Sequence, residues 1–315
     1  MPISDGHKSG HAADAAFKGV SFFFAFAVMA LLSAIIFVLI KESWLSIGKF
    51  GLGFLVSSTW DPVQGVFGAL PAVWGTVVSS VIAIIIAVPI SLGNAIFLTE
   101  TAPKGIKGPI GAAIELLASI PSIIYGMWGL FVFAPFIAEN VEPFMIERLG
   151  FIPLFRGAPL GVGMLPAGFI LAIMIIPFIS SVARDVFLMV PPILKESGYA
   201  VGATKWEVIW KVVIPFAKSG IMGAVILGLG RALGETMAVT FIIGNSQRIS
   251  LELLNPGTSI SAALANEFTE AVEDIYLSSL VELGLILFVI TFVVLAAAKL
   301  MIARSSYRPY SGGAR

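Results

Sequence analysis

Six stretches of this sequence are apolar for about twenty residues or more, and this pattern limits the chain to one kind of fold. The stretches cover residues 20–40, 71–99, 109–135, 160–182, 219–244 and 277–303. A helix needs about 20 mostly apolar residues to cross the hydrocarbon core of a bilayer. Inside a bilayer the backbone polar groups must be satisfied within each spanning segment, which favours helices. The sequence therefore predicts an all-α, polytopic membrane protein with six transmembrane helices.

Composition agrees with this prediction and excludes several classes of function. Apolar residues make up 58% of the 315 residues and charged residues only 12%, whereas soluble domains average about 45–50% and 25%. The absence of cysteine excludes disulfides, thiolate metal sites and thiol nucleophiles. A net charge of zero provides no overall field to attract nucleic acid. His7 and His11 have no metal-ligating neighbours in the sequence, so we predict no metal site and no cofactor.

The basic residues are divided unequally between the two sides of the predicted helices. Of the 19 lysines and arginines, thirteen fall on one side, five fall on the other, and Arg231 lies within a helix. Basic residues are enriched in cytoplasmic loops, so we expect both termini to be cytoplasmic. The first apolar stretch is longer than the apolar region of a signal peptide, which is about 7–15 residues, and has no cleavage site at its end. We therefore expect it to remain as the first helix.

Segment 184–218, on the predicted cytoplasmic side, has the pattern of two short helices. Pro192 can open the first helix, and Thr204 can cap a second, which is predicted to end at Pro215. The second helix is amphipathic, with Trp206 on its apolar face. Such a pair of helices suits contact with a cytoplasmic partner. It equally suits an interfacial position with the tryptophans at headgroup level.

Arg231 and Glu235 interrupt the fifth apolar stretch and are four residues apart. This spacing predicts that they share one face of one helix, buried at mid-span. Arginine at a helix centre costs about 2.5–3.5 kcal/mol on insertion scales, and an apolar replacement for a buried pair is often at least as stable. Stability alone therefore does not explain why the pair is present.

Two interpretations of the pair remain. One is an intrahelical salt bridge that only neutralises itself. The other is a water-accessible path for a charged solute, because the planar donors of arginine bind an oxyanion such as phosphate in bidentate fashion. In that interpretation Glu235 would keep Arg231 from binding the anion too tightly, because a transported ion must also be released.

The segment 184–218 also resembles a known family. Glu196, Gly202 and Pro215 reproduce the spacing of the loop E-A-A-x3-G-x9-I-x-L-P that is found in ABC importer permeases. Ser197 and Gly198 replace the two alanines, which is a small-for-small change. The resemblance implies that this loop docks on an ATP-hydrolysing subunit, with Gly202 at the turn.

Two further motifs are similar to the phosphate-specific members of that family. Residues 231–236 read R-A-L-G-E-T, which matches the signature R-A-x-G-E-T. Residues 115–126 match E-L-L-A-x-I-P-S-x-x-Y-G. These importers have two permease subunits, a C-type and an A-type, and residues 60–76 resemble the C-type subunit. The resemblance extends from about residue 40 to 303 and implies the type I ABC importer (MetI-like) permease fold.

The residues and the resemblance together yield two groups of expected functional residues and a division of the chain. The expected substrate-pathway residues are Arg231, Glu235, Thr236, Ser119 and Ser122. The three hydroxyls would line a polar track, or would instead bond the carbonyl four residues earlier, as hydroxyls in membrane helices usually do. The expected residues of the ATPase coupling loop are Glu196, Tyr199, Ala200, Gly202, Trp206 and Pro215. The expected segments are a cytoplasmic N-terminal tail at 1–19, a first transmembrane helix at 20–40, a periplasmic segment at 41–70, a permease core at 71–303 that contains the coupling loop 184–218, and a cytoplasmic C-terminal tail at 304–315.

The function that the resemblance implies is ATP-driven import of inorganic phosphate across the cytoplasmic (inner) membrane by alternating access. The implied partners are a second homologous permease in a heterodimer, two ATP-binding subunits at the cytoplasmic face, a periplasmic phosphate-binding protein and membrane lipid, without nucleic acid. The chain contains no G-x4-G-K-[ST] loop, so we expect a non-catalytic transport subunit rather than an enzyme.

Three alternatives to this function differ in what they require. The same architecture could import sulfate or molybdate, because the charge pair indicates an oxyanion more firmly than it indicates phosphate. A stand-alone secondary anion transporter would be expected to carry an inverted repeat, which we do not detect. A membrane-embedded enzyme would need a cluster of acids, histidines or a nucleophile, which the later spans lack.

Three lesser patterns also yield expectations. A stripe of small residues in the fifth span predicts close approach of another helix; it consists of Gly220, Ala224, Gly228 and Ala232. The acidic run 267–274 is interpreted either as a solvated face or as a docking surface. Glu115 is expected near the cytoplasmic end of the third span, where it either snorkels or lines the pathway.

Overall fold

The computed structural model describes residues 6–306, and all of its regular elements within that range are helices. In chain order they are α1 (Gly6–Glu42), α2 (Trp44–Phe50), α3 (Gly53–Val56), α4 (Leu70–Ile96), η1 (Phe97–Thr101), α5 (Lys104–Ala118), α6 (Ser122–Trp128), η2 (Gly129–Phe133), α7 (Ala134–Phe136), η3 (Ile137–Val141), α8 (Glu142–Leu149), η4 (Pro153–Phe155), α9 (Met164–Leu188), α10 (Pro192–Ala200), α11 (Lys205–Val208), η5 (Ile209–Val213), α12 (Ile214–Leu233), α13 (Met237–Thr240), α14 (Ile260–Glu267) and α15 (Asp274–Ser306). The outer parts of the two predicted tails, 1–5 and 307–315, lie outside the described residues.

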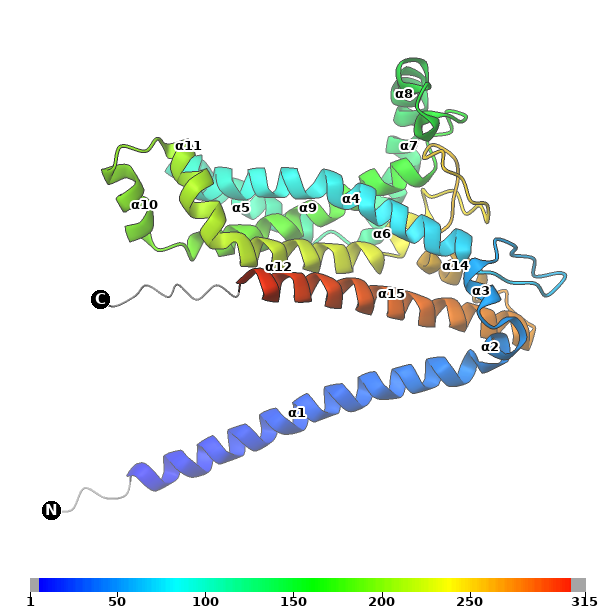
Figure 1. The fold of residues 1–315 in the computed structure, drawn as a ribbon, viewed down its shortest axis with the longest axis horizontal. Coiled ribbons are helices and arrows are strands. Elements are labelled where there is room, and N and C mark those ends of the chain that lie inside the picture. Colours follow the sequence, from blue (N-terminus) through cyan, green and yellow to red (C-terminus); the bar gives the residue numbers. More distant parts are fainter. Residues whose placement is uncertain (1–5, 307–315) are drawn as a thin grey trace.

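Six helical stretches are long and apolar enough to cross a membrane, which confirms the predicted number. They are Ala16–Glu42, Leu70–Thr101, Ser122–Leu149, Met164–Leu188, Lys205–Leu233 and Asp274–Ile302. The first belongs to α1, which already begins at Gly6 within the segment expected to be a tail. Figure 1 shows α4, α9, α12 and α15 running along a common direction, with α10 and α11 at one end and α3 and α14 at the other.

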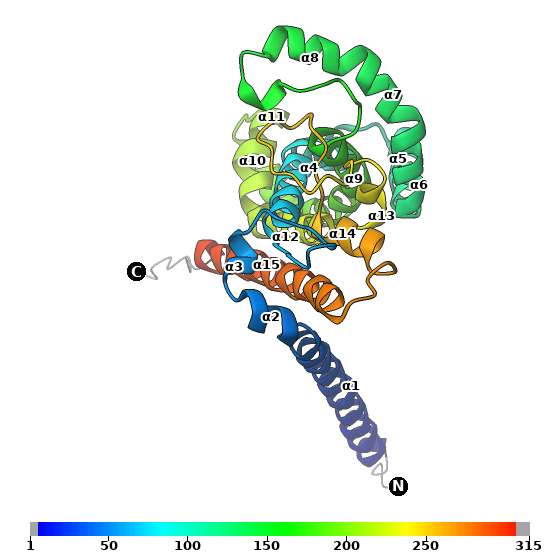
Figure 2. The same ribbon diagram turned by 90° about the vertical axis from the view of Figure 1, so that its right-hand side faces the viewer.

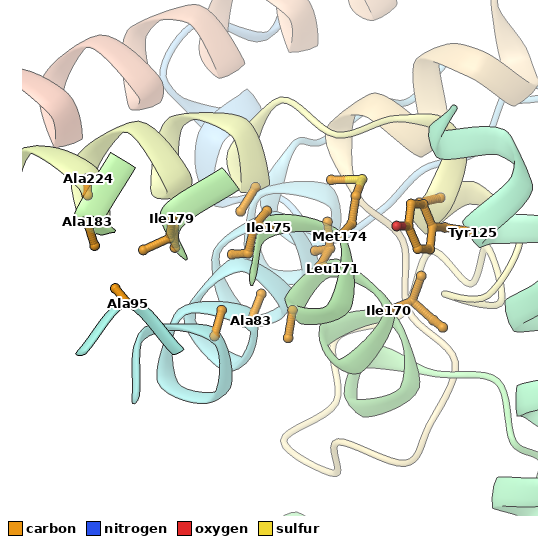
Figure 3. Packing of buried hydrophobic residues seen from close by; sticks show 14 of the residues in the cluster. Ala83, Ala95, Tyr125, Ile170, Leu171, Met174, Ile175, Ile179, Ala183 and Ala224 are labelled. Atoms are coloured by element: carbon orange, nitrogen blue, oxygen red, sulfur yellow. The ribbon is translucent and has the colours of Figure 1, made fainter. Parts of the chain in front are cut away.

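The centre of the bundle is α9, which packs against both α4 and α12. It is 61% buried over its most apolar window, far more than any other span. Figure 3 shows Ala183 of α9 with Ala95 of α4 on one side and Ala224 of α12 on the other, and all three are buried. Small side chains at these positions allow the backbones to approach closely. The core is therefore formed by three helices built around α9.

Glycines of α12 confirm the predicted close approach. A Cβ on Gly220 would lie 2.5 Å from a methyl carbon of Val186, and one on Gly228 would lie 2.5 Å from Ile179. Both of these neighbours belong to α9. The stripe of small residues thus faces the central helix.

Two predicted spans are broken, so the predicted bounds of both were wrong. The stretch 109–135 is divided at residues 119–121 between α5 and α6. Pro121 has an extended backbone there, and the residue before a proline is disfavoured in helix. The stretch 219–244 is likewise divided at residues 234–236, where Gly234 closes α12.

The helix that leads into α12 also differs from the prediction at Pro215. We expected it to end there, but α11, η5 and α12 form one stretch from Lys205 to Leu233. Pro215 lies in the first turn of α12, directly after the π-helical turn η5. A π-turn changes the hydrogen-bond register locally, which relieves the requirement for the amide that proline lacks.

The end of the bundle away from α10 and α11 is closed by a cap, which consists of α2, α3, α14 and the loops beside them. Its core contains Phe54, Phe67 and Tyr276. The start of α14 is seated on α4, because the backbone N–H of Ile260 donates to Oγ1 of Thr76 at 2.9 Å. At the neighbouring Gly75 a Cβ would overlap the carbonyl oxygen of Thr258.

Helix α1 diverges from the rest of the molecule (Figures 1 and 2). Its most apolar window is 0% buried, and it packs only near its end, on α2 and α15. There the hydroxyl of Ser278 donates to the carbonyl of Glu42 at 2.7 Å, and the amide of Ser46 donates to Ser278 at 3.1 Å. Hydrogen bonds at this elbow therefore set the direction of α1.

Candidate functional site

Arg231 lies in the last turn of α12, and its side chain is exposed on the surface of this chain. Its guanidinium carbon is 5.9 Å from the ring centroid of Phe178 on α9. The structure gives it no salt bridge among the described side chains. Because an arginine that faces lipid is costly, this surface is suited to face water or another protein.

Glu235 does not pair with Arg231, so the prediction of two charges on one helix face was wrong. The helix ends at Leu233, and Glu235 lies in the non-helical break that follows. There its backbone oxygen accepts a hydrogen bond from the hydroxyl of Ser261 at 2.7 Å. Its side chain accepts one from the amide of Ala238, at the start of α13, at 3.4 Å. Glu235 therefore holds the shape of the break and leaves Arg231 free of an intrahelical partner.

The two broken helices meet close to their breaks, because α6 packs on α13. A Cβ on Gly126 would lie 2.9 Å from the carbonyl oxygen of Met237. Across the first break, the hydroxyl of Tyr125 donates to the carbonyl of Leu117 at 2.8 Å. Irregular backbone within membrane spans is a feature of transporter binding sites.

The hydroxyl residues expected in the pathway differ in their surroundings. Ser119 lies in the first break and donates to the carbonyl of Leu116 at 2.7 Å, while Ser122 begins α6. Thr236 lies in the second break beside Glu235 and lines a cavity of about 1000 Å³ between α1, α2, α14 and α15. The structure shows no direct polar contact between these hydroxyls and Arg231.

The segment 184–218 forms a hairpin of α10 and α11 at one end of the bundle (Figure 1). Gly202 forms the turn with φ +83°, a conformation that favours glycine. Thr204 and Glu207 form a reciprocal capping box at the start of α11, as the predicted cap requires. All six residues expected in the coupling loop are exposed: Glu196, Tyr199, Ala200, Gly202, Trp206 and Pro215. The hairpin therefore offers a free surface.

Glu115 is tied to the neighbouring helix. Its carboxylate is 3.0 Å from the guanidinium of Arg184, at the end of α9 near the hairpin. A local ion pair accounts for its position. No cluster of three or more metal-ligating side chains occurs among the residues searched within 6–306.

Sequence reasoning missed the role of Glu267, which it placed in an acidic run. The Glu267 carboxylate accepts hydrogen bonds from Trp60 Nε1 at 2.6 Å, Tyr276 OH at 2.8 Å and Gln247 Nε2 at 2.9 Å. These donors come from three different segments of the cap. No local signal could reveal this convergence, since the donors are distant in sequence. The rest of the run, from Glu270 onward, is mostly exposed.

We expect Glu267→Ala to destabilise the cap by about 1–3 kcal/mol, because it leaves three donors in a partly buried site without their acceptor. The thermal unfolding midpoint of the purified protein in detergent measures the loss. Glu270→Ala, which removes an exposed carboxylate of the same run, serves as the matched control and should leave the midpoint unchanged. Equal midpoints for the two variants would contradict the role of Glu267.

Comparison with known proteins adds to this geometry. Residues 95–307 match the family described as "Binding-protein-dependent transport system inner membrane component". The chain is 56% identical over 299 residues to the "Phosphate transport system permease protein PstC" of Mesorhizobium japonicum, covering 94% of this chain and 91% of that protein. It is 54% identical over 298 residues to the protein of the same name from Pasteurella multocida, covering 93% of each.

Solved structures with a similar fold include two ABC transporters. One is the MetNI methionine ABC transporter in an inward-facing conformation, with a TM-score of 0.57 and 18% identity over 79% of this chain and 100% of that chain. The other is a bacterial alginate ABC transporter in complex with its alginate-bound periplasmic protein, with a TM-score of 0.56 and 16% identity over 92% and 98%. At these identities the likeness shows the fold, which is that of ABC transporter permeases.

Proposed function

This chain belongs to the family of binding-protein-dependent transport system inner membrane components, and we propose that it is the permease subunit of an ABC importer that carries inorganic phosphate. The observation that carries the proposal is the 54–56% identity to phosphate permeases over more than nine-tenths of the chain. The exposed guanidinium of Arg231 beside a broken helix agrees with an anionic substrate.

In the proposed mechanism Arg231 binds phosphate transiently as it passes. The guanidinium can donate two parallel hydrogen bonds to phosphate oxygens, and the nearby ring of Phe178 offers no competing acceptor. Glu235 acts mainly by fixing the break that follows Arg231. Its carboxylate also supplies negative charge near the path, which favours release of the anion.

We place the hairpin of α10 and α11 on the cytoplasmic side, together with both termini. The support for this orientation is the excess of lysine and arginine in the segments at that end. The exposed hairpin then docks on an ATP-binding subunit, and a homologous hairpin on a second permease docks on another. Hydrolysis takes place on those subunits, because the present chain lacks a nucleotide-binding loop.

A second, homologous permease would cover the exposed apolar surface of α1 and the cavity beside it, which Gly234 and Thr236 also line. At the end of the bundle away from the α10–α11 hairpin, α8 and the loop after it arch over one side of the bundle (Figure 2). The loop is anchored because the amide of Gly161 donates to the fully buried Glu142 at 2.8 Å. This anchored arch suits the docking of a periplasmic phosphate-binding protein.

Reconstitution of the complete complex in proteoliposomes tests the function. With ATP inside the vesicles and the binding protein outside, we expect uptake of labelled phosphate and no uptake of sulfate or molybdate. ATP-dependent uptake of another oxyanion without phosphate uptake would contradict the substrate assignment. Anion uptake by this chain alone would instead favour a secondary transporter.

A further inference from the structure

Helix α10 is weakly attached to the bundle. It has no buried residue, and it packs on α11 and η5, which belong to the same hairpin segment. The helix packs closely on α11 at Gly198, where a Cβ would lie 3.0 Å from a methyl carbon of Val208. Apolar packing therefore holds α10 to its own hairpin and contributes little to its attachment to the transmembrane helices.

One ion pair joins α10 to the bundle directly. The ammonium of Lys195 is 2.5 Å from Oε1 of Glu100, which lies in η1 at the end of the span that begins with α4. The Glu100 side chain is only 8% exposed and that of Lys195 is 21% exposed. Among the hydrogen bonds and ion pairs of the described side chains, no other joins α10 to a helix outside 184–218.

The other connections of α10 lead to different helices. Its start follows α9 through Val190 and Pro191, and its end continues through α11 and η5 into α12. Neither connection leads along the chain to α4. Helix α4 itself packs extensively on α9 and binds the start of α14. Movement of α10 would therefore act on α9 and α12 through the chain and reach α4 indirectly through their packing, whereas the Lys195–Glu100 contact links α10 directly to the span of α4.

We propose that the Lys195–Glu100 ion pair transmits movement of the α10–α11 hairpin to α4, and that both are positioning residues for ATP-driven transport. The proposal rests on the proposed function, since it requires an ATP-binding subunit on the hairpin. The pair is shielded from water, so its attraction is screened less by salt than that of an exposed pair. Loss of either partner leaves the other charge poorly solvated and unpaired, and α10 can then move without α4.

The test measures phosphate taken up per ATP hydrolysed by the reconstituted complex. The variants are Glu100→Lys, Lys195→Glu and the double exchange of the two charges. Coupling between sites is typically worth at least about fivefold, so we expect each single variant to lower the ratio by about fivefold or more. The ATP-binding subunits should still copurify. The double exchange should restore the ratio to within about twofold, which independent effects of the two residues would not predict.

Two further variants keep the test decisive. Lys299→Gln removes an exposed lysine of α15 at the same end of the bundle and should leave the ratio unchanged. If a charge reversal prevents assembly, Glu100→Gln replaces it, since the amide keeps the size of the side chain but removes its charge.

The proposal is overturned if the single variants that assemble keep the wild-type ratio, or if the double exchange assembles and does not recover it. These outcomes presuppose that the wild-type complex imports phosphate. A wild-type complex that hydrolyses ATP without importing phosphate would contradict the proposed function instead, so the two failures are distinguishable.

Discussion

Replacing Arg231 with glutamine should lower ATP-driven phosphate uptake by about 30-fold or more. Truncating one partner of a buried, hydrogen-bonded charge pair costs about 2 kcal/mol or more, a condition that Arg231 meets once the pathway encloses the bound anion, and each 1.4 kcal/mol corresponds to about tenfold. Arg231 is exposed at the end of α12, and no ion pair with another described side chain holds it. Its loss should therefore remove an interaction with the substrate while the fold is retained. Uptake into proteoliposomes by the full complex measures the effect.

Companion variants separate charge from geometry at this site. Arg231→Lys keeps the charge but loses the planar pair of donors, so we expect an intermediate rate. Glu235→Gln still accepts from the Ala238 amide, so any change in its rate reports the charge of Glu235. Uptake by Arg231→Gln within about twofold of the wild type, with ATP-binding subunits bound normally, would rule out Arg231 as a substrate contact.

Replacing Gly75 with leucine should destabilise the protein by about 3 kcal/mol, at the upper end of the usual cost of overpacking. A Cβ at this position would overlap the carbonyl oxygen of Thr258. A backbone atom cannot rotate away as a side chain can. The bond from Ile260 to Thr76 fixes the same segment against α4, so α14 would have to move from its seat. The fall in the thermal unfolding midpoint in detergent measures this loss.

Gly93 provides the matched control for this substitution. It also lies within α4, but a Cβ there would meet nothing within 4 Å. Leucine has a higher helix propensity than glycine by roughly 0.5–1 kcal/mol, so Gly93→Leu should leave the midpoint unchanged or raise it. Comparable losses in the two variants would show that α4 rejects leucine for a reason other than the contact with Thr258.

The sequence predicts the number of spans well because hydropathy over about 20 residues is a strong local signal. Local chemistry also reveals the cap at Thr204, since a cap depends on a few neighbouring residues. The turn at Gly202 was indicated by the family resemblance. The stripe of small residues on α12 correctly indicates a close neighbour. These features require no knowledge of which distant segments come together.

The breaks at 119–121 and 234–236 were not identified from the sequence, because apolar residues resume after each one and hydropathy over about 20 residues does not resolve so short an interruption. The second break is held by Ser261, which lies 26 positions from Glu235. The spacing of Arg231 and Glu235 therefore suggested a shared helix face that the tertiary contacts do not allow. The hydrogen bonds to Glu267 and the Lys195–Glu100 pair escaped prediction for the same reason.

The diverging helix α1 has a consequence for how the complex is built. In water an apolar helix with none of its most apolar window buried would aggregate, but lipid tails solvate it as well as protein does. The subunit can therefore insert and fold with lipid in place of its partner. If the proposed second permease covers α1, assembly is an exchange of lipid for protein along α1, driven by packing and interhelical hydrogen bonds rather than by the hydrophobic effect.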